Sequence, residues 1–454
     1  MKPHYRSRAA GSTRRLYPDA AGIDVGASVH YVAVPADRDS QPVRHFTAFT
    51  EDLFALADWL SSCRITSVAM EATGVYWIPL FEILERRGFE VVLVNARHVK
   101  NVPGRKSDVI DCQWLQELHS LGMLSASFRP SDAVVALRGY VRQRKMLVQY
   151  AAAHVQHMHK ALVQMNVLLQ NVVSDVTGTT GMKIIRAILA GERDPKVLAQ
   201  HRDYRCKASV ETIEKSLIGN WRAEHLFALR QAVELNDFYH RQITDCDHMI
   251  ESYTSSLQKV AEVAALPPST KLRKTPERNE PQFDLRSRMF EIVGVDLTQI
   301  DGIRAYTVLQ LIAEIGTDMS RWKTASHFAS WLGLCPPINI TGGVRHRGWI
   351  PSKAHRAAAI FRMAAVNVRN SRSAIGAFFR RKRSQLGPAR AVVATAHKLA
   401  RIVYTVLSTR SQFIDPGEHA YEQNSRERAL RALHRKAHAF GFVLAPINTQ
   451  GAVT

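Results

Sequence analysis

The sequence predicts an α/β domain at the N-terminus, then a long helical arm, then a mainly helical, basic C-terminal domain. Three observations lead to this prediction. Strand-like and helical segments alternate from residue 18 to residue 128, apolar residues recur at regular steps from Leu137 to Val172, and residues 319–414 contain no Asp or Glu. A chain of 454 residues is too long for one compact core, so two or three domains are expected.

The N-terminal region alternates short apolar runs with segments of helical pattern. Residues 22–37 predict a hairpin of two strands, and residues 65–73 and 89–96 predict two further strands. Helices are expected over residues 49–63 and 76–88. This order predicts an α/β domain with a mixed sheet.

The central region has the pattern of a long helix. Apolar residues step by four and three in turn, and ten of eleven such positions are apolar, which predicts a coiled-coil seam. Residues 223–257 predict a second long helix, so an antiparallel arm with a small helical tip is expected, with the seam paired within the chain or between chains. The seam positions are Leu137, Val141, Arg144, Val148, Ala151, Val155, Met158, Leu162, Met165, Leu169 and Val172.

A stretch with four prolines and many charges, residues 266–285, indicates a linker before the C-terminal domain. The expected segments are a basic arm at 1–17, an α/β domain at 18–130, a coiled-coil helical region at 131–265, a linker at 266–288, a C-terminal domain at 289–412 and a tail at 413–454.

The charge of the chain points to a polyanionic partner. The formal net charge is +21, and residues 319–414 hold 17 Lys and Arg without a single acid, which favours nucleic acid over a membrane. No run of 18 apolar residues predicts a transmembrane helix, and the basic N-terminus lacks the apolar centre of a signal peptide. Five scattered cysteines form no zinc pattern and indicate reduced thiols in the cytoplasm.

Four acids in the N-terminal region predict a metal site. Asp24 interrupts an apolar strand, Glu71 ends another, and Asp108 and Asp111 are spaced to share one helix face. A carboxylate within a core strand costs several kcal/mol unless it is paired, and converging carboxylates repel unless a cation neutralises them. Magnesium, which prefers oxygen ligands, is the natural cation. The ordinary alternatives are a turn-capping aspartate, a surface glutamate and acids favoured by a helix dipole.

Two motifs in the C-terminal region are compatible with nucleic-acid chemistry. Residues 298–316 predict a helix–hairpin–helix with Gly302 at the turn, although two plainly packed helices explain it equally well. A hydroxyl precedes two glycines in Thr341-Gly342-Gly343, and Arg345 and Arg347 follow, an arrangement suited to attack on a phosphodiester. Taken alone, this motif is also an ordinary hairpin turn.

Taken together, these segments resemble the DEDD transposases of bacterial insertion sequences of the one-ten family, nearly end to end. The resemblance is carried by GIDVGASVHYVAV, AMEATGVYW, GRKSDVIDCQWLQELHSLGML, TGMKIIRAILAGERDP, RCKAS, EHLFALRQAVELNDFY, IDGIRAYTVLQLIAEIG, ASWLGLCPPINITGG and AVVATAHKLARIVYTVL.

The resemblance implies an RNase H-like domain of RuvC type that holds Mg²⁺ through Asp24, Glu71, Asp108 and Asp111. It implies a C-terminal transposase domain with a serine nucleophile, a tetramer built as a dimer of dimers, and a structured guide RNA that specifies donor and target DNA. The reaction would pass through a transient covalent protein–DNA link and need no ATP. A cytoplasmic protein associated with the bacterial nucleoid is expected.

The sequence departs from the family pattern at the nucleophile. Where the family has serine before two glycines, this chain has Thr341, whose extra methyl group restricts χ1 and crowds in-line attack. Thr341 is the expected counterpart; Ser352 as the nucleophile, and an inactive element, are the alternatives. Arg345, Arg347, Lys353 and Arg356 are expected to contact RNA or DNA.

The same residues admit comparison with other functions. Asp24 with the following Val-Gly-Ala-Ser is reminiscent of a phosphate loop of sugar kinases, but the further motifs of that class are missing from the sequence. A junction-type nuclease using metal-activated water would need only the four acids. A nucleic-acid-binding scaffold with a decayed site is the non-catalytic alternative. About 230 residues separate the four acids from Thr341, so a shared site must be assembled by folding or between protomers.

Overall fold

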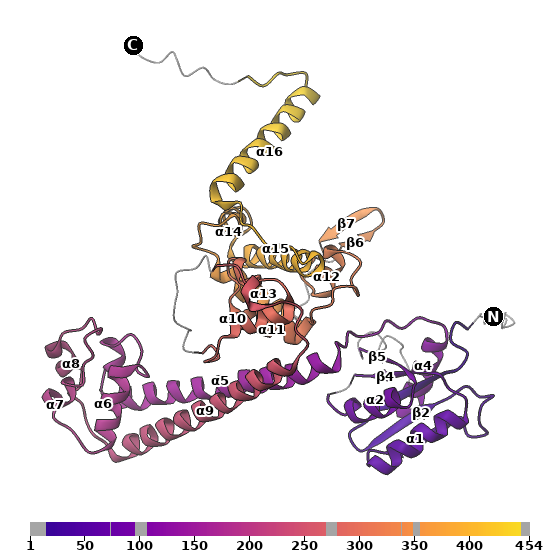
Figure 1. The fold of residues 1–454 in the computed structure, drawn as a ribbon, viewed down its shortest axis with the longest axis horizontal. Coiled ribbons are helices and arrows are strands. Elements are labelled where there is room, and N and C mark those ends of the chain that lie inside the picture. The colour runs from indigo at the N-terminus through magenta and orange to yellow at the C-terminus, as the bar shows by residue number, and fades with distance from the viewer. Residues whose placement is uncertain are drawn as a thin grey trace, which may run out of the picture. The chain divides into compact units, whose positions relative to one another are not determined.

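A computed structural model describes residues 15–72, 74–95, 107–268, 279–336, 338–347 and 355–445, with the backbone alone for 338–341 and 345–347. The chain divides into two compact units, Met1–Arg129 and Pro130–Thr454. Figure 1 shows the elements of both units along the chain. Each unit has its own architecture and is described separately.

The N-terminal unit is built on a mixed sheet of five strands, which confirms the predicted α/β class. The strand order is β3-β2-β1-β4-β5; β1 pairs antiparallel with β2 and parallel with β4, and β5 extends the parallel part. The strands are β1 (Ala20–Val25), β2 (Val29–Ala33), β3 (Val43–Thr47), β4 (Ser67–Glu71) and β5 (Glu90–Val94).

The edge strand β3 was not expected from the sequence. Its residues, VRHFT, are half-buried or exposed and carry two basic side chains, so the apolar alternation that marks a strand is weak. A short, charged edge strand is a common way to prevent a sheet from pairing with another chain. The charged, weakly apolar sequence that made β3 difficult to predict therefore also protects this edge from pairing with another chain.

Helices cover the two faces of this sheet. On one face α1 (Thr50–Ser62) and α2 (Trp77–Arg86) pack on Ile23 and Met70 to form the main core of the unit. On the other face lies α4 (Asp108–Ser120), where His119 Nε2 contacts Ser67 Oγ at 2.7 Å. Because side chains alternate along a strand, the residues next to Ile23 and Met70 face α4.

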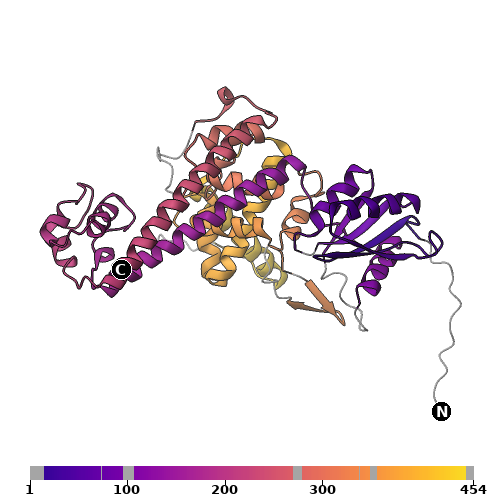
Figure 2. The ribbon, with the colours of Figure 1, turned by 90° about the horizontal axis from the view of Figure 1, so that it is seen from below.

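The second unit begins with two long helices that form the arm. They are α5 (Asp132–Gln164) and α9 (Ala223–Ser256), which lie side by side in both views (Figures 1 and 2). Tyr253 Oη donates a hydrogen bond to the carbonyl of Ala133. Because residue 253 near the end of α9 meets residue 133 at the start of α5, the two helices are antiparallel.

The predicted long helix is correct over most of its length but ends earlier than the seam suggests. The chain leaves α5 after Gln164, and Asn166 adopts a left-handed conformation with φ of 54°. The last seam positions, Leu169 and Val172, instead belong to the tip, where Leu169 starts a single 3-10 turn, η1 (Leu169–Asn171). Leu169 and Val172 still pack into apolar surroundings, as predicted, because the core of the tip is continuous with the core at the end of the arm.

The tip of the arm is a small helical cluster with its own core. Ile184, Ile188 and Leu198 are buried there with the ends of α5 and α9. Its helices are α6 (Thr179–Leu189), α7 (Pro195–Ala199) and α8 (Val210–Ser216).

The polar position in the predicted seam has a structural explanation. Arg144 is fully buried and forms an ion pair with Asp247 on α9. Its guanidinium also donates to the carbonyl of Asn279 at 2.9 Å and lies 4.8 Å from the ring centre of Tyr306. A buried charge is tolerated only with such partners. Arg144 therefore fixes the arm against the start of the helical C-terminal part.

The rest of this unit is mainly helical, as predicted, with one small hairpin. Phe328 and Phe361 are fully buried at its centre, and Trp322 and Phe379 are nearly so. The elements are η2 (Val263–Ala265), α10 (Leu285–Val293), η3 (Leu297–Gln299), α11 (Ala305–Ile315), α12 (Ala325–Trp331), β6 (Ile338–Thr341), β7 (Val344–Arg347), α13 (Arg356–Asn367), α14 (Ala374–Leu386), α15 (Pro388–Thr409) and α16 (Gly417–Ala439).

The expected helix–hairpin–helix over residues 298–316 is wrong in its first half. Only the single turn η3 precedes Gly302, and α11 follows it. Gly302 has φ of +82°, and a Cβ there would lie 2.5 Å from the carbonyl oxygen of Ala364 on α13. Glycine is therefore required by close packing between backbone segments. This supports the packing explanation of the motif over a phosphate-binding one.

No helix in the described part of the chain is long and apolar enough to span a membrane. This agrees with the hydropathy of the sequence, which has no long uncharged apolar run.

Candidate functional site

Two of the predicted acids lie at the carboxyl ends of neighbouring parallel strands. Ile23 of β1 pairs with Met70 of β4, so Asp24 and Glu71 are the next residues along both strands. Ile23 and Met70 point into the core with α1 and α2. By alternation, Asp24 and Glu71 lie on the opposite face of the sheet, which α4 covers.

A glycine in β1 sets the position of α4. A Cβ on Gly22 would lie 2.3 Å from the backbone nitrogen of Gln116 and 2.4 Å from the carbonyl oxygen of Cys112. The side chain of Gln116 donates to the carbonyl of Ala20 at 3.2 Å. The helix backbone therefore lies directly on the strand, as only glycine permits.

The same contacts place the other two acids. Gly22 lies against the helical turn from Cys112 to Gln116, and the Gln116 side chain reaches back to Ala20, so α4 runs antiparallel to β1. Four helical residues rise about 6 Å and two strand residues about 6.6 Å. Moving two residues along β1, from Gly22 to Asp24, therefore corresponds to moving four residues toward the start of α4. This brings the first turn of α4, with Asp108 and Asp111, to the level of Asp24.

Local sequence explains why α4 begins there. The Ser107 hydroxyl caps the helix and accepts a hydrogen bond from the backbone N–H of Ile110 at 3.3 Å. Asp108 and Asp111 follow in the first turn, where the helix dipole favours negative charge. We call Asp24, Glu71, Asp108 and Asp111 together the acidic edge.

The electrostatics of Cys112 reflect the negative charge of the acidic edge. Burial, together with the carboxylates of Asp24 and, to a lesser degree, Asp111, raises the pKa of this thiol to about 12. Both carboxylates therefore act on the same buried sulfur from two different elements. The thiol stays protonated at physiological pH and serves as packing, not as a nucleophile.

The donor chemistry of the acidic edge fits a hard divalent cation, since all four side chains offer carboxylate oxygens. Within the described ranges, however, no group of three or more His, Cys, Asp or Glu residues is close enough together to hold a metal ion. Glu71 lies on the strand end next to Asp24, and the helix acids lie one element away. The assignment of these four residues as metal ligands stays a prediction.

The proposed nucleophile lies at a hairpin turn in the second unit. Thr341 ends β6 and pairs with Val344, the first residue of β7. Between them Gly342 and Gly343 have φ of +59° and +75°. A two-residue turn with two left-handed residues requires glycine and matches the twist of the strands. The glycines are thus explained by the turn itself, and the catalytic role of Thr341 stays a prediction.

The predicted basic residues are spread over the segment after this turn. Arg345 and Arg347 lie on β7, opposite Ile340 and Ile338. Arg356 is exposed at the first residue of α13. Lys353 falls outside the described residues. The structure thus places two of the four on the hairpin and a third at the start of the next described helix.

Sequence reasoning missed the residues that position the acidic edge. Gly22, Gln116 and the buried pair Ser67–His119 dock α4 on the sheet. One signal was available, because a glycine inside an apolar strand often marks the close approach of another backbone. The side-chain contacts of Gln116 and His119 follow only from the register of α4 against β1.

Comparison with protein families matches both parts of the chain. A model of DEDD transposases of IS110 type, described as Transposase, matches residues 21–167, the segment that includes the acidic edge. A second model, described as Transposase IS116/IS110/IS902 family, matches residues 296–380 and includes Thr341. No curated protein matches the chain.

The two matched segments together span just over half of the chain, and they occur in the order that the sequence motifs indicated. The chain belongs to the IS116/IS110/IS902 family of transposases, enzymes that act on DNA.

Proposed function

We propose that this transposase excises and inserts its own element by metal-assisted attack of a protein hydroxyl on a DNA phosphate. The observation that carries the proposal is the placement of Asp24 and Glu71 on adjacent strand ends, with the acidic first turn of α4 docked at the same level. Carboxylates gathered on rigid elements suit a divalent cation that binds phosphate.

The N-terminal unit is, in this proposal, an RNase H-like domain of RuvC type. Its support is the strand order β3-β2-β1-β4-β5, in which only β2 runs against its neighbours, with α4 carrying acids on one face. Asp24, Glu71, Asp108 and Asp111 would hold Mg²⁺. The bound ion would supply charge stabilisation at the scissile phosphate.

The Thr341 hydroxyl is the proposed nucleophile. Its oxygen forms a bond to phosphorus while the bond from phosphorus to the 3′ oxygen breaks, and the leaving 3′ oxygen takes up a proton. The product is a 5′-phosphothreonyl link and a free 3′ hydroxyl, and reversal of the step with a new 3′ hydroxyl joins the strands without ATP. Arg345, Arg347, Lys353 and Arg356 would contact phosphates.

The proposed partners are donor DNA, target DNA and a structured guide RNA from the element. The net charge of +21 and the acid-free tract support polyanionic partners. We further propose a homo-oligomer, a dimer of dimers that associates through the arm, acting in the bacterial cytoplasm at the nucleoid. The support is the arm itself, which carries exposed apolar residues such as Phe227 and Phe238.

A reconstituted recombination assay tests the proposal. Purified full-length protein is combined with donor DNA, target DNA, the flanking non-coding RNA and magnesium, and joined products are sequenced. We expect precise joints that disappear when EDTA removes the metal or when the RNA is omitted.

Two other outcomes correspond to the alternative functions. Cleaved DNA without joints, independent of the RNA, would indicate a junction-type nuclease that uses metal-activated water. Tight RNA binding without cleavage or joining would indicate a scaffold with a decayed site. Either result would overturn the proposed recombination.

A further inference from the structure

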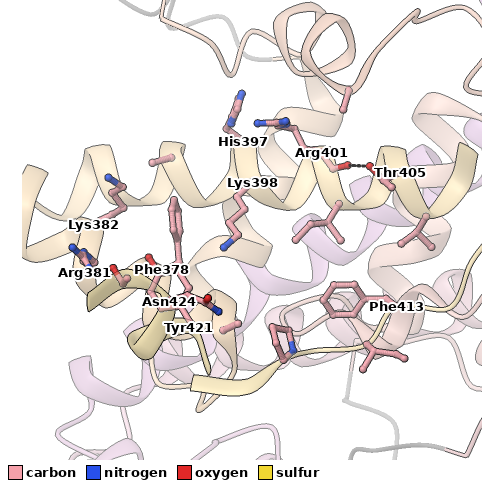
Figure 3. A pocket seen from close by; sticks show the side chains of 18 of the residues that line it. Phe378, Arg381, Lys382, His397, Lys398, Arg401, Thr405, Phe413, Tyr421 and Asn424 are labelled. Atoms are coloured by element: carbon pink, nitrogen blue, oxygen red, sulfur yellow. Dashed lines mark hydrogen bonds between the residues drawn. The ribbon is translucent and has the colours of Figure 1, made fainter. Parts of the chain in front are cut away.

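A groove lies at the C-terminal end of the second unit, apart from the hairpin of Thr341. It has a volume of about 1050 Å³ and runs between α14, α15, the segment 411–416 and the first turns of α16 (Figure 3). We call it the α14–α16 groove. Small-molecule pockets typically enclose about 300–1,000 Å³, so the groove lies at the upper end of that range and has room for a short segment of a polymer.

The groove is strongly positive. Five cationic side chains line it, and among the residues described no Asp or Glu does. Of these cations, Arg381, Arg401 and Arg428 are exposed and form no ion pair with any described acid. Three guanidinium groups on three different helices, without acids to neutralise them, repel each other. This arrangement favours an anionic ligand.

A lysine at the centre of the groove is held by aromatic rings. The ammonium of Lys398 lies 4.5 Å from the ring centre of Phe378 and 5.0 Å from that of Tyr421. Burial lowers the pKa of Lys398 and Arg428 lowers it further, while the carboxylate of Asp415 acts in the opposite direction. Figure 3 shows Lys398 close to Phe378 and Tyr421, with Phe413 farther along the groove. The groove thus combines cations with half-buried rings, each of which keeps part of its surface exposed.

The groove is fixed by contacts that anchor the start of α16. Arg380 on α14 pairs with Glu418, and the backbone N–H of Glu418 donates to the carbonyl of Arg372 at 3.2 Å. Asp415 accepts a hydrogen bond from the backbone N–H of Ala374 at 3.2 Å. These bonds hold the first turns of α16 against α14. The two walls of the groove are therefore connected by a specific polar network.

We propose that the α14–α16 groove binds a segment of single-stranded nucleic acid. Phosphates would lie on Arg381, Arg401 and Arg428, and a base would stack against Tyr421 or Phe378. The inference rests on the proposed function and deepens it by naming where a nucleic-acid partner binds; none of these residues takes part in the chemistry assigned to Thr341 or the acidic edge. Most of the groove also lies past residue 380, where the second family match ends.

Aromatic side chains decide between the candidate polyanions. Duplex DNA offers phosphates but keeps its bases stacked inside, so the rings would have no partner. An acidic peptide would use the cations but gain little from the rings. Single strands offer phosphates and open base faces together, the combination that stacking platforms in positive grooves recognise. RNA and DNA single strands share this chemistry, and the test separates them.

The test measures binding, so its result is independent of whether Thr341 is the nucleophile. The full chain is titrated with fluorescent single-stranded RNA, single-stranded DNA and duplex DNA of equal length, and with poly-glutamate as competitor, over a range of salt. The groove variant is Arg381→Gln/Arg401→Gln/Arg428→Gln. The matched control, Lys196→Gln/Lys207→Gln/Lys215→Gln, removes three exposed charges from the arm tip.

We expect the groove variant to lower the slope of log K against log salt by about 2 for single strands, since each phosphate contact contributes roughly 0.7. Tyr421→Ala should weaken single-strand binding roughly 5- to 150-fold, the effect of one lost stacking contact. Tyr204→Ala, an exposed ring on the arm tip, should leave it unchanged. The strand that binds more tightly, single-stranded RNA or single-stranded DNA of equal length, is taken as the natural ligand of the groove.

Photocrosslinking locates the contact directly. Oligonucleotides with 4-thiouridine or bromodeoxyuridine should crosslink to peptides that contain Phe378 or Tyr421. Crosslinks elsewhere only, with equal salt slopes for groove and control variants, would overturn the proposal. So would a preference for duplex DNA or displacement by poly-glutamate at equal charge. Circular dichroism melts of each variant exclude unfolding as the cause of any loss.

Discussion

The acidic edge of the N-terminal unit and the α14–α16 groove of the second unit hold charges of opposite sign in different ways. Asp24 and Glu71 end strands of a buried sheet, and their place is fixed by backbone pairing. Arg381, Arg401 and Arg428 extend from helix surfaces and are exposed. Rigid placement suits chemistry that depends on geometry, whereas exposed cations suit contact with many phosphates. The difference agrees with the roles proposed for the two regions, metal binding at the acidic edge and nucleic-acid binding in the α14–α16 groove.

The largest expected effect is on the acidic edge. Asp24→Asn keeps the shape of the side chain but removes its charge. Mutation of residues that only support metal ligands costs about 10- to 100-fold in metal affinity or activity, so loss of a ligand charge should lower metal affinity and recombination by more than about 100-fold. Recombination assays with a magnesium titration measure this loss.

The matched control is Glu117→Gln, which removes one charge from an exposed position of α4, two turns beyond the acids. It should retain activity. Equal activity of Asp24→Asn and Glu117→Gln would mean that the acidic edge contributes no more to the reaction than other acids on α4.

A smaller effect is expected when the docking of α4 is disturbed. Gly22→Ala would place a Cβ against the backbone of Gln116 and Cys112, so the unit should lose about 1–3 kcal/mol of stability, typical of overpacking. Recombination should fall as well, since α4 carries Asp108 and Asp111. Chemical denaturation of the full chain, monitored by a spectroscopic signal from the N-terminal unit, measures the change in stability.

Gly139→Ala is the control for this substitution. Gly139 lies inside α5, and a Cβ there meets no described atom within 4 Å. This variant should gain roughly 0.5–1 kcal/mol through improved helix propensity. A Gly22→Ala variant as stable as wild type would show that α4 does not depend on close contact with β1.

The smallest effect concerns pH. Burial lowers the pKa of His119 below its ordinary value of 6.5. The unfolded chain binds this proton more readily, so stability is complete above pH 6.5 and decreases as the pH falls below it, by at most about 1.4 kcal/mol per pH unit. Thermal melts between pH 5 and 8 should show this loss.

His119→Gln should reduce that pH dependence and leave the contribution of His30, whose pKa is also lowered by burial. A pH profile identical to that of wild type would mean that the Ser67–His119 contact is not sensitive to protonation. His397, which lines the α14–α16 groove, also has its pKa lowered by burial and keeps its own contribution in this variant.

Much of the fold could be predicted because local pattern and final structure agree. The apolar strands around Asp24 and Glu71, the long helices of the arm and the turn at Gly342 all have strong local signals. The strand β3 was missed because an exposed, charged edge lacks apolar alternation. The end of α5 was missed because the seam continues into the tip on the same apolar side.

The sites could be predicted less completely, because a site depends on how elements pack. The sequence indicated that the acids belong together, but the contact of Gly22 with α4, which sets their level, depends on tertiary packing. The α14–α16 groove extends beyond the acid-free tract to Arg428 on α16, a helix with three acids of its own. Its charge becomes visible only when three helices are assembled.

The central claim is that this transposase joins DNA through a hydroxyl of its own, and the most direct measurement is a search for the covalent adduct. Wild-type protein, Thr341→Ala, Thr341→Ser and Asp24→Asn are incubated with donor DNA, RNA and magnesium, denatured, and the DNA-linked peptide is identified by mass spectrometry. The account predicts a link on residue 341 in the wild type and in Thr341→Ser, and none in Thr341→Ala or Asp24→Asn. A link on Ser352, or DNA cleavage without any link, would contradict it.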